Sequence, residues 1–190
     1  MWVGNVIFCP LLRITDERAS QMGRAKMRSE ELNREFLLVK DAAYRYAVSI
    51  LHDPTTAEDL TQDLYEKLWN RRLFIRQKGF RSLAMTAMRN MCMDTLRKRH
   101  RAYDEVEYEQ ASAEAYTPPD EEDMGKIVKG LIAQLPVKER EVIHLRDCEQ
   151  MEFCDICEIM GTTEQAARMA LSRARTKVKN ELLKIMNYGL

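Results

Sequence analysis

The residues best suited to chemistry lie in one short segment near the C-terminus, where basic and small polar side chains recur at helical spacing. Gln165, Arg168, Ser172, Arg175 and Lys179 fall on one side of a predicted helix. Arginine donates two parallel hydrogen bonds to guanine or to a phosphate group, so such a face suits DNA. The segment predicts a DNA-reading helix, and an amphipathic helix with a merely solvated basic face is the alternative.

The elements that must position these side chains form a predicted helix-turn-helix over residues 151–178. Gly161 marks the turn, because glycine adopts the left-handed conformation at a helix end at little cost. Thr162 and Gln165 fit a capping box that would open the second helix. The buried stripe of that helix is predicted to hold Ala167, Leu171, Ala174, Val178, Leu182 and Ile185.

The charge of the chain is balanced overall but strongly divided along the sequence. The 30 basic and 30 acidic residues cancel. Residues 71–103 carry ten basic residues against one acid, and residues 104–123 carry nine acids and no base. The neutral total therefore hides a surface that could bind a polyanion. A solvated basic helix end beside an unrelated acidic loop is the other interpretation.

Cysteine and histidine usage argues against a disulfide framework and against catalysis. The five cysteines are odd in number and irregularly spaced, as in cytoplasmic proteins with reduced thiols. Cys148, Cys154 and Cys157 lack further ligands with metal spacing, so we expect small buried hydrophobic side chains. The three histidines are isolated and there is no phosphate-cradling glycine loop, so we expect no enzyme, no metal and no cofactor.

Helical periodicity without strand alternation predicts an all-α protein of two small helical domains joined by a flexible acidic linker. We expect an N-terminal extension at 1–29, a first domain at 30–101, the linker at 102–121 and a helix-turn-helix domain at 122–187. In the first domain, Asp53-Pro54 should end the first long helix, and Thr55 with Glu58 should cap the second. No stretch has the roughly 18 apolar residues of a membrane span.

Four segments, taken in order, resemble the extracytoplasmic-function (ECF) class of sigma factors in the sigma-70 family. They are AEDLTQDLYEKLW (57–69), FRSLAMTAMRNMCMDTLRKR (80–99), LPVKEREVIHL (135–145) and residues 151–175. The details of the second and fourth segments are similar to the versions found in Bacteroidetes. The resemblance implies a factor that binds core RNA polymerase, recognises the −35 and −10 promoter elements and aids melting at −10.

The resemblance also implies roles for individual residues. Residues facing the polymerase clamp would be Glu58, Asp59, Gln62 and Asp63, although the acids alone fit the positive end of their own helix equally well. Residues meeting −10 DNA would be Arg89, Asn90, Arg97, Lys98 and Arg99, with a pocket for an extruded base near 71–80. Residues reading −35 DNA would be Arg168, Met169, Ser172 and Arg173.

The expected partners are core RNA polymerase, promoter DNA and a membrane-bound anti-sigma factor, with the chain itself a cytoplasmic monomer that does not insert into the membrane. A helix-turn-helix regulator that does not load polymerase is the alternative function, but it would not need segments 57–69 and 80–99. The divided charge adds one hypothesis: in the free protein, the acidic linker contacts the two basic surfaces and holds the domains closed.

Overall fold

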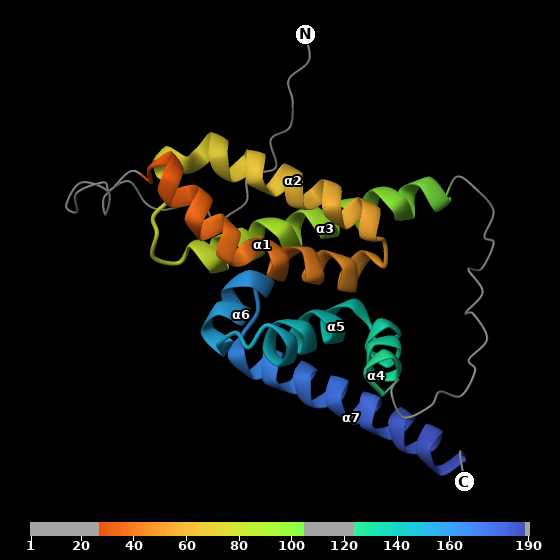
Figure 1. Cartoon of the computed structure of the whole chain (residues 1–190). Coiled ribbons are helices and arrows are strands. Elements are labelled where there is room, and N and C mark those ends of the chain that lie inside the picture. Colours follow the sequence, from red (N-terminus) through yellow and green to blue (C-terminus); the bar gives the residue numbers. More distant parts are fainter. Residues whose placement is uncertain (1–26, 105–123, 189–190) are drawn as a thin grey trace.

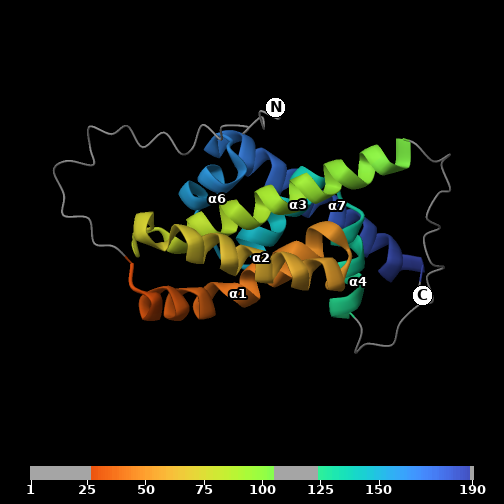
Figure 2. The same ribbon diagram turned by 90° about the horizontal axis from the view of Figure 1, so that it is seen from above.

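The computed structural model describes residues 27–104 and 124–188, and within these ranges the chain is helical with no strand. Two helical layers lie side by side: α1, α2 and α3 form one, and α4 to α7 form the other (Figure 1). Seen from above, α3 runs across α6 and α7 (Figure 2). The predicted all-α architecture with two helical domains is confirmed. The extension at 1–26 and the acidic segment 105–123 lie outside the described residues.

The N-terminal domain is a bundle of three helices, α1 (Ser29–Leu51), α2 (Pro54–Arg71) and α3 (Phe80–Asp104), with a 3-10 turn η3 (Arg72–Phe74) between the last two. One apolar face of α1 is buried, including Leu32, Phe36 and Val39, as is Met27 just before the helix. The first helix ends at His52, whose φ of 54° is left-handed.

The cap of α2 differs from the expected one. Asp53 occupies the N-cap position: its carboxylate accepts hydrogen bonds from the backbone N–H of Thr56 at 3.1 Å and from the Thr56 hydroxyl. Pro54 takes the first helical position, where its missing N–H costs nothing. The capping box predicted at Thr55 and Glu58 is therefore wrong, because α2 starts at Pro54, two residues earlier than that box requires.

The C-terminal domain consists of α4 (Met124–Ala133), α5 (Val137–Ile143), a π-helical turn η5 (His144–Cys148), α6 (Phe153–Met160) and α7 (Glu164–Tyr188). Helices α6 and α7 are the predicted helix-turn-helix. Gly161 ends α6 with a φ of 61°, as predicted. The predicted capping box at Thr162 is wrong by one residue, because the Thr163 hydroxyl accepts from the backbone N–H of Ala166 at 3.3 Å.

The two domains share one continuous core rather than standing apart. Helix α3 packs on α6, and α1 packs on α5 and η5 (Figure 1). A closed arrangement is therefore present. The contacts that hold it come from these helices, whereas the linker acids that we expected to hold it lie outside the described residues, so their part stays a prediction.

Candidate nucleic-acid interface

The first turns of α7 present the side chains predicted to read DNA. Ala167, Leu171 and Ala174 are buried against the rest of the domain. These three positions fix the rotation of the helix, so the side chains on its opposite side face outward. The four predicted −35 readers are all exposed on that outward face: Arg168, Met169, Ser172 and Arg173.

Arg168 is held in place before any ligand arrives. Its guanidinium donates to a carboxylate oxygen of Glu164 at 2.6 and 2.8 Å and lies 4.1 Å from the ring centroid of Phe153 on α6. An exposed pair one helical turn apart contributes little stability, on the order of 0.5 kcal/mol. Its main effect is to restrict the side chain, which reduces the ordering cost of a later contact with DNA.

Two other basic residues of α7 are engaged within their own domain. Arg175 forms a two-pronged ion pair with Asp147 of η5, and Lys177 contacts Glu139 of α5 at 2.7 Å. These contacts tie the middle of α7 to the helices behind it. Arg168 and Arg173 therefore lie on the outward face of α7, whereas Arg175 and Lys177 stabilise the packing of α7 on its own domain.

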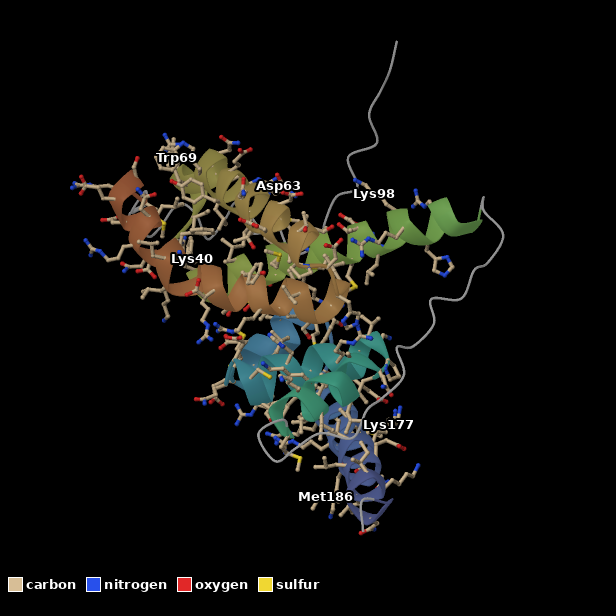
Figure 3. The ribbon with its side chains drawn as sticks, turned by 45° about the vertical axis from the view of Figure 1, so that its right-hand side comes forward. Lys40, Asp63, Trp69, Lys98, Lys177 and Met186 are labelled. Atoms are coloured by element: carbon tan, nitrogen blue, oxygen red, sulfur yellow. The ribbon has the colours of Figure 1, made fainter. Side chains whose placement is uncertain are left out.

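On α2, four exposed side chains form what we call the acidic ridge: Glu58, Asp59, Gln62 and Asp63. Leu60, Leu64 and Leu68 are buried on the opposite side of the same helix. Figure 3 places Asp63 on the side of the N-terminal domain that faces away from α7. The ridge is thus open to a partner without disturbing the contact between the domains.

The five residues predicted to meet −10 DNA are divided by the fold. Asn90, Arg97 and Lys98 are exposed on α3, with Arg97 paired to Asp94 one turn earlier at 2.6 Å. Figure 3 shows Lys98 projecting outward from α3. The other two, Arg89 and Arg99, are occupied by contacts with distant parts of the chain.

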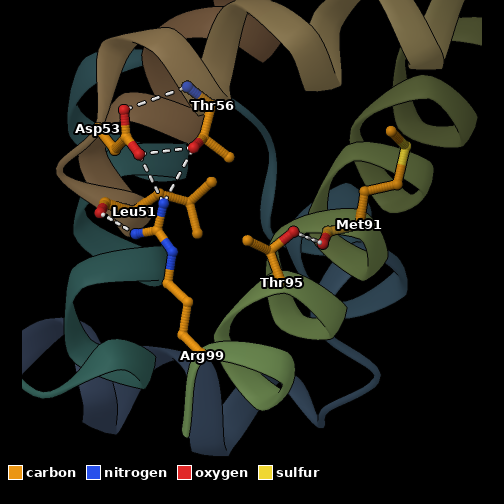
Figure 4. Close-up of polar contacts among 6 residues, drawn as sticks. All are labelled: Leu51, Asp53, Thr56, Met91, Thr95 and Arg99. Atoms are coloured by element: carbon orange, nitrogen blue, oxygen red, sulfur yellow. Dashed lines mark hydrogen bonds and ion pairs between the residues drawn. The ribbon is translucent and has the colours of Figure 1, made fainter. Parts of the chain in front are cut away.

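Arg99 holds the turn between α1 and α2 (Figure 4). Its guanidinium donates to the backbone oxygen of Leu51 at 3.2 Å, to the Asp53 carboxylate at 2.6 Å and to the Thr56 hydroxyl at 3.0 Å. A cation there compensates the carbonyls at the C-terminus of α1 and the cap of α2 together. The structure gives this arginine a bracing role that spacing along α3 did not reveal.

Arg89 points into the contact between the domains. Its Nε donates to a carboxylate oxygen of Glu141 at 2.6 Å, and only 20% of its side chain remains exposed. Glu141 is fully buried and also accepts from the hydroxyl of Tyr46 at 2.7 Å. Burial, followed by the nearby Glu141 charge, raises the pKa of Tyr46 well above its usual value, so the hydroxyl stays protonated and donates.

The segment between α2 and α3 contains an exposed aromatic residue that the sequence reasoning missed. Phe74 is 85% exposed, while its neighbour Ile75 is buried and anchors the segment. Arg72 lies 4.6 Å from the ring centroid of Trp69 and donates to the Trp69 backbone oxygen. An exposed aromatic side chain among basic residues offers a stacking surface for an unpaired base. Its position within the predicted base-capture segment was the signal available in the sequence.

The expectation of buried cysteines fails on α6. Cys154 is exposed, and Cys157 is half-buried against the core, whose fully buried α6 residues are Ile156 and Ile159. Cys148, in η5, is exposed as well. Within residues 27–104 and 124–188, no three His, Cys, Asp or Glu side chains gather closely enough to hold a metal ion. None of the helices in those ranges combines the length and the apolar character that crossing a bilayer requires.

Comparison with known proteins agrees with this geometry. The Sigma-70 region 2 model matches residues 36–102, and the Sigma-70 region 4 model matches residues 126–178. A probable RNA polymerase sigma factor, RfaY of Xanthomonas campestris pv. campestris, is 30% identical over 146 residues, which are 72% of this chain and 36% of that protein. The RNA polymerase sigma-E factor of Streptomyces coelicolor is 26% identical, covering 76% of this chain and 81% of that one.

Two solved structures share the fold. The sigma factor RpoE of Bartonella quintana, in complex with the anti-sigma factor NepR, has a TM-score of 0.70 at 26% identity and covers 82% of this chain and 98% of that chain. CnrH, in complex with the cytosolic domain of CnrY, has a TM-score of 0.61 at 20% identity, with 82% and 89% covered. With region 2 and region 4 models matched in order along one helical chain, the protein belongs to the sigma-70 family.

Proposed function

We propose that the chain is an RNA polymerase sigma factor that directs promoter-specific initiation by binding core polymerase, recognising −35 and −10 elements and aiding melting at −10. The observation that carries the proposal is the presence of both domains in one chain, each with its own exposed functional surface. A regulator that only binds DNA would need the face of α7 but not the acidic ridge on α2. The helix-turn-helix regulator remains the alternative that the experiment below must reject.

The acidic ridge is the surface proposed to contact core polymerase. Its side chains project from a helix whose other face is fixed by three buried leucines, so the ridge is rigid. A basic partner surface would be attracted over the range of a Debye length, about 8 Å at physiological salt. Such charge pairing contributes orientation and association rate more than affinity.

Promoter reading is proposed to be divided between the domains. The outward face of α7 would read −35 bases through Arg168 and Arg173, with Met169 and Ser172 shaping the contact. Asn90, Arg97 and Lys98 would contact −10 DNA from α3, and Phe74 would stack on a base extruded during melting. Extrusion costs a few kcal/mol of lost stacking, which an aromatic contact worth about 1–3 kcal/mol would largely offset.

The finer assignment is to the ECF class of Bacteroidetes type, with an anti-sigma factor as inhibitor. The two solved relatives are complexes, one with an anti-sigma factor and one with the cytosolic domain of CnrY. We extend this to the present chain and propose that its inhibitor is membrane-bound. The sigma factor itself would act as a cytoplasmic monomer without inserting into the bilayer and without enzymatic activity or a cofactor.

Run-off transcription tests the proposal directly. Purified core polymerase, the chain and a template from the gene's own upstream region should give a discrete transcript that is absent without the chain. If the chain binds the template but no transcript forms with core polymerase, the alternative of a DNA-binding regulator is correct.

A further inference from the structure

A buried carboxylate of the C-terminal domain is satisfied entirely by side chains of the N-terminal domain. Glu141 lies on α5 and is 0% exposed. Its recorded donors in the described chain are the hydroxyl of Tyr46 on α1 and the guanidinium of Arg89 on α3, at 2.7 and 2.6 Å. A buried charge without partners is strongly unfavourable. The Glu141 carboxylate is therefore stable in two states: with the domains in contact, or with the domains apart and the carboxylate hydrated.

A second carboxylate repeats the arrangement nearby. Arg45 on α1 donates from Nε and Nη2 to the two carboxylate oxygens of Glu149, both at 2.9 Å, and Arg81 on α3 donates to the Glu149 backbone oxygen at 2.9 Å. Burial lowers the pKa of the adjacent His144, so at neutral pH the histidine is uncharged and the arginines carry the compensation. Glu141 and Glu149 of the C-terminal domain thus contact three arginines of the N-terminal domain.

The contact is also reciprocal. Arg140, the neighbour of Glu141 on α5, donates to the backbone oxygens of Ser49 and Ile50 at 3.4 and 3.3 Å. Those carbonyls belong to the last turn of α1, where a helix lacks internal partners and carries partial negative charge. Arg140 and Glu141, adjacent in sequence and opposite in charge, thus both contact the N-terminal domain. Together they fix how the two domains are positioned against each other.

We propose that Glu141, Tyr46 and Arg89 form a latch that holds the free chain closed, and that opening this latch is required before Arg89 can contact DNA phosphate. Arginine pairs with carboxylate and with phosphate in the same two-pronged geometry, so Glu141 occupies the place that DNA would take. The proposal deepens the proposed function, on which it rests, by assigning a regulatory contact to the −10 surface. Binding is weakened by the fraction of molecules that remain closed.

The latch makes a prediction that the acidic linker does not. Attraction between the linker acids and basic groups in contact with solvent would fade at 1 M salt, where the Debye length is about 3 Å. The Glu141 contact is buried and excludes the screening ions, so the closed form should persist at that salt concentration.

The test compares wild type with Glu141→Gln, which removes the charge at nearly constant shape. Its matched control is Glu139→Gln on the same helix, because Glu139 pairs with Lys177 inside the C-terminal domain. Small-angle scattering of the full chain at 0.1 M and 1 M salt should show a larger radius of gyration for Glu141→Gln than for the other two proteins. Affinity for a labelled duplex from the upstream region should rise about tenfold without polymerase.

Tyr46→Phe guards against a folding artefact, since it removes one hydroxyl and keeps the buried ring. It should also expand the particle and raise DNA affinity, by a smaller factor. The latch is refuted if both variants match wild type, if Glu139→Gln expands the particle equally, or if wild type opens at 1 M salt. Run-off transcription with core polymerase on the same proteins distinguishes failure of the latch from failure of the proposed function. If wild type gives a transcript but the variants keep the wild-type radius of gyration, only the latch is refuted. If wild type gives no transcript, the proposed function is refuted.

Discussion

The turn of the helix-turn-helix allows a sharp prediction, because two glycines of the same domain should respond to the same substitution with opposite signs. Gly161 has a φ of 61° and Gly130 lies within helix α4. A Cβ added to either glycine meets nothing within 4 Å. Steric contacts therefore cancel from the comparison, and only the backbone conformation decides the outcome.

The magnitudes follow from the backbone alone. An alanine held in the left-handed conformation costs about 1–2 kcal/mol, so Gly161→Ala should destabilise the C-terminal domain by about that amount. An alanine in a helix interior is favoured over glycine by about 0.5–1 kcal/mol, so Gly130→Ala should stabilise it. Gly161→Asn should fall between wild type and Gly161→Ala, because asparagine tolerates the left-handed region.

Urea unfolding of the full chain, followed by circular dichroism, measures these changes. With an m value of about 1.5 kcal/mol per molar urea, a loss of about 1 kcal/mol lowers the midpoint by about 0.7 M. Under native conditions the DNA affinity of Gly161→Ala should be unchanged, since the direction of α7 is preserved. A neutral or stabilising Gly161→Ala would refute the reasoning, and so would a loss far above 2 kcal/mol, which would mean that the Cβ meets a close neighbour.

Three further predictions concern surface chemistry. Reversing charge with Asp59→Lys and Asp63→Lys should weaken binding to core polymerase in a native-gel titration and leave the melting temperature nearly unchanged, because both side chains are exposed; unaltered affinity would mean that these acids only support their own helix. Arg173→Ala should cost about 1–3 kcal/mol of DNA-binding free energy and relax base preference at one −35 position; a uniform loss for Arg173→Ala across a randomised −35 library would contradict the assignment. Hydrogen bonds from the Thr56 hydroxyl and backbone N–H lower the pKa of Asp53. The ionised carboxylate therefore stabilises the fold above about pH 4, and this stabilisation is lost as the pH falls through the lowered pKa. In Asp53→Asn the melting temperature should accordingly fall less steeply with decreasing pH on the acid side.

The sequence by itself determined the helices and their buried faces. Apolar residues at spacings of three and four are a local signal. Of the buried stripe predicted for α7, Ala167, Leu171 and Ala174 are buried, whereas Val178, Leu182 and Ile185 further along the helix are only half-buried. Gly161 ended α6 as predicted, because the left-handed conformation is a property of that residue type. Caps were less certain, since several neighbouring hydroxyls and carboxylates compete for the same few backbone N–H groups, and at α2 and α7 a neighbouring residue took the position.

Only the tertiary structure decided which basic residues remain available for DNA. Arg89, Arg97 and Arg99 lie on one basic helix, and nothing in their spacing separates them. Their partners do: Glu141 lies 52 positions from Arg89 and Asp53 lies 46 positions from Arg99, whereas Arg97 pairs with its helical neighbour Asp94. An ion pair depends on where two chain segments meet in space. Periodicity reports which face of a helix is apolar, but not which distant carboxylate its polar face will meet.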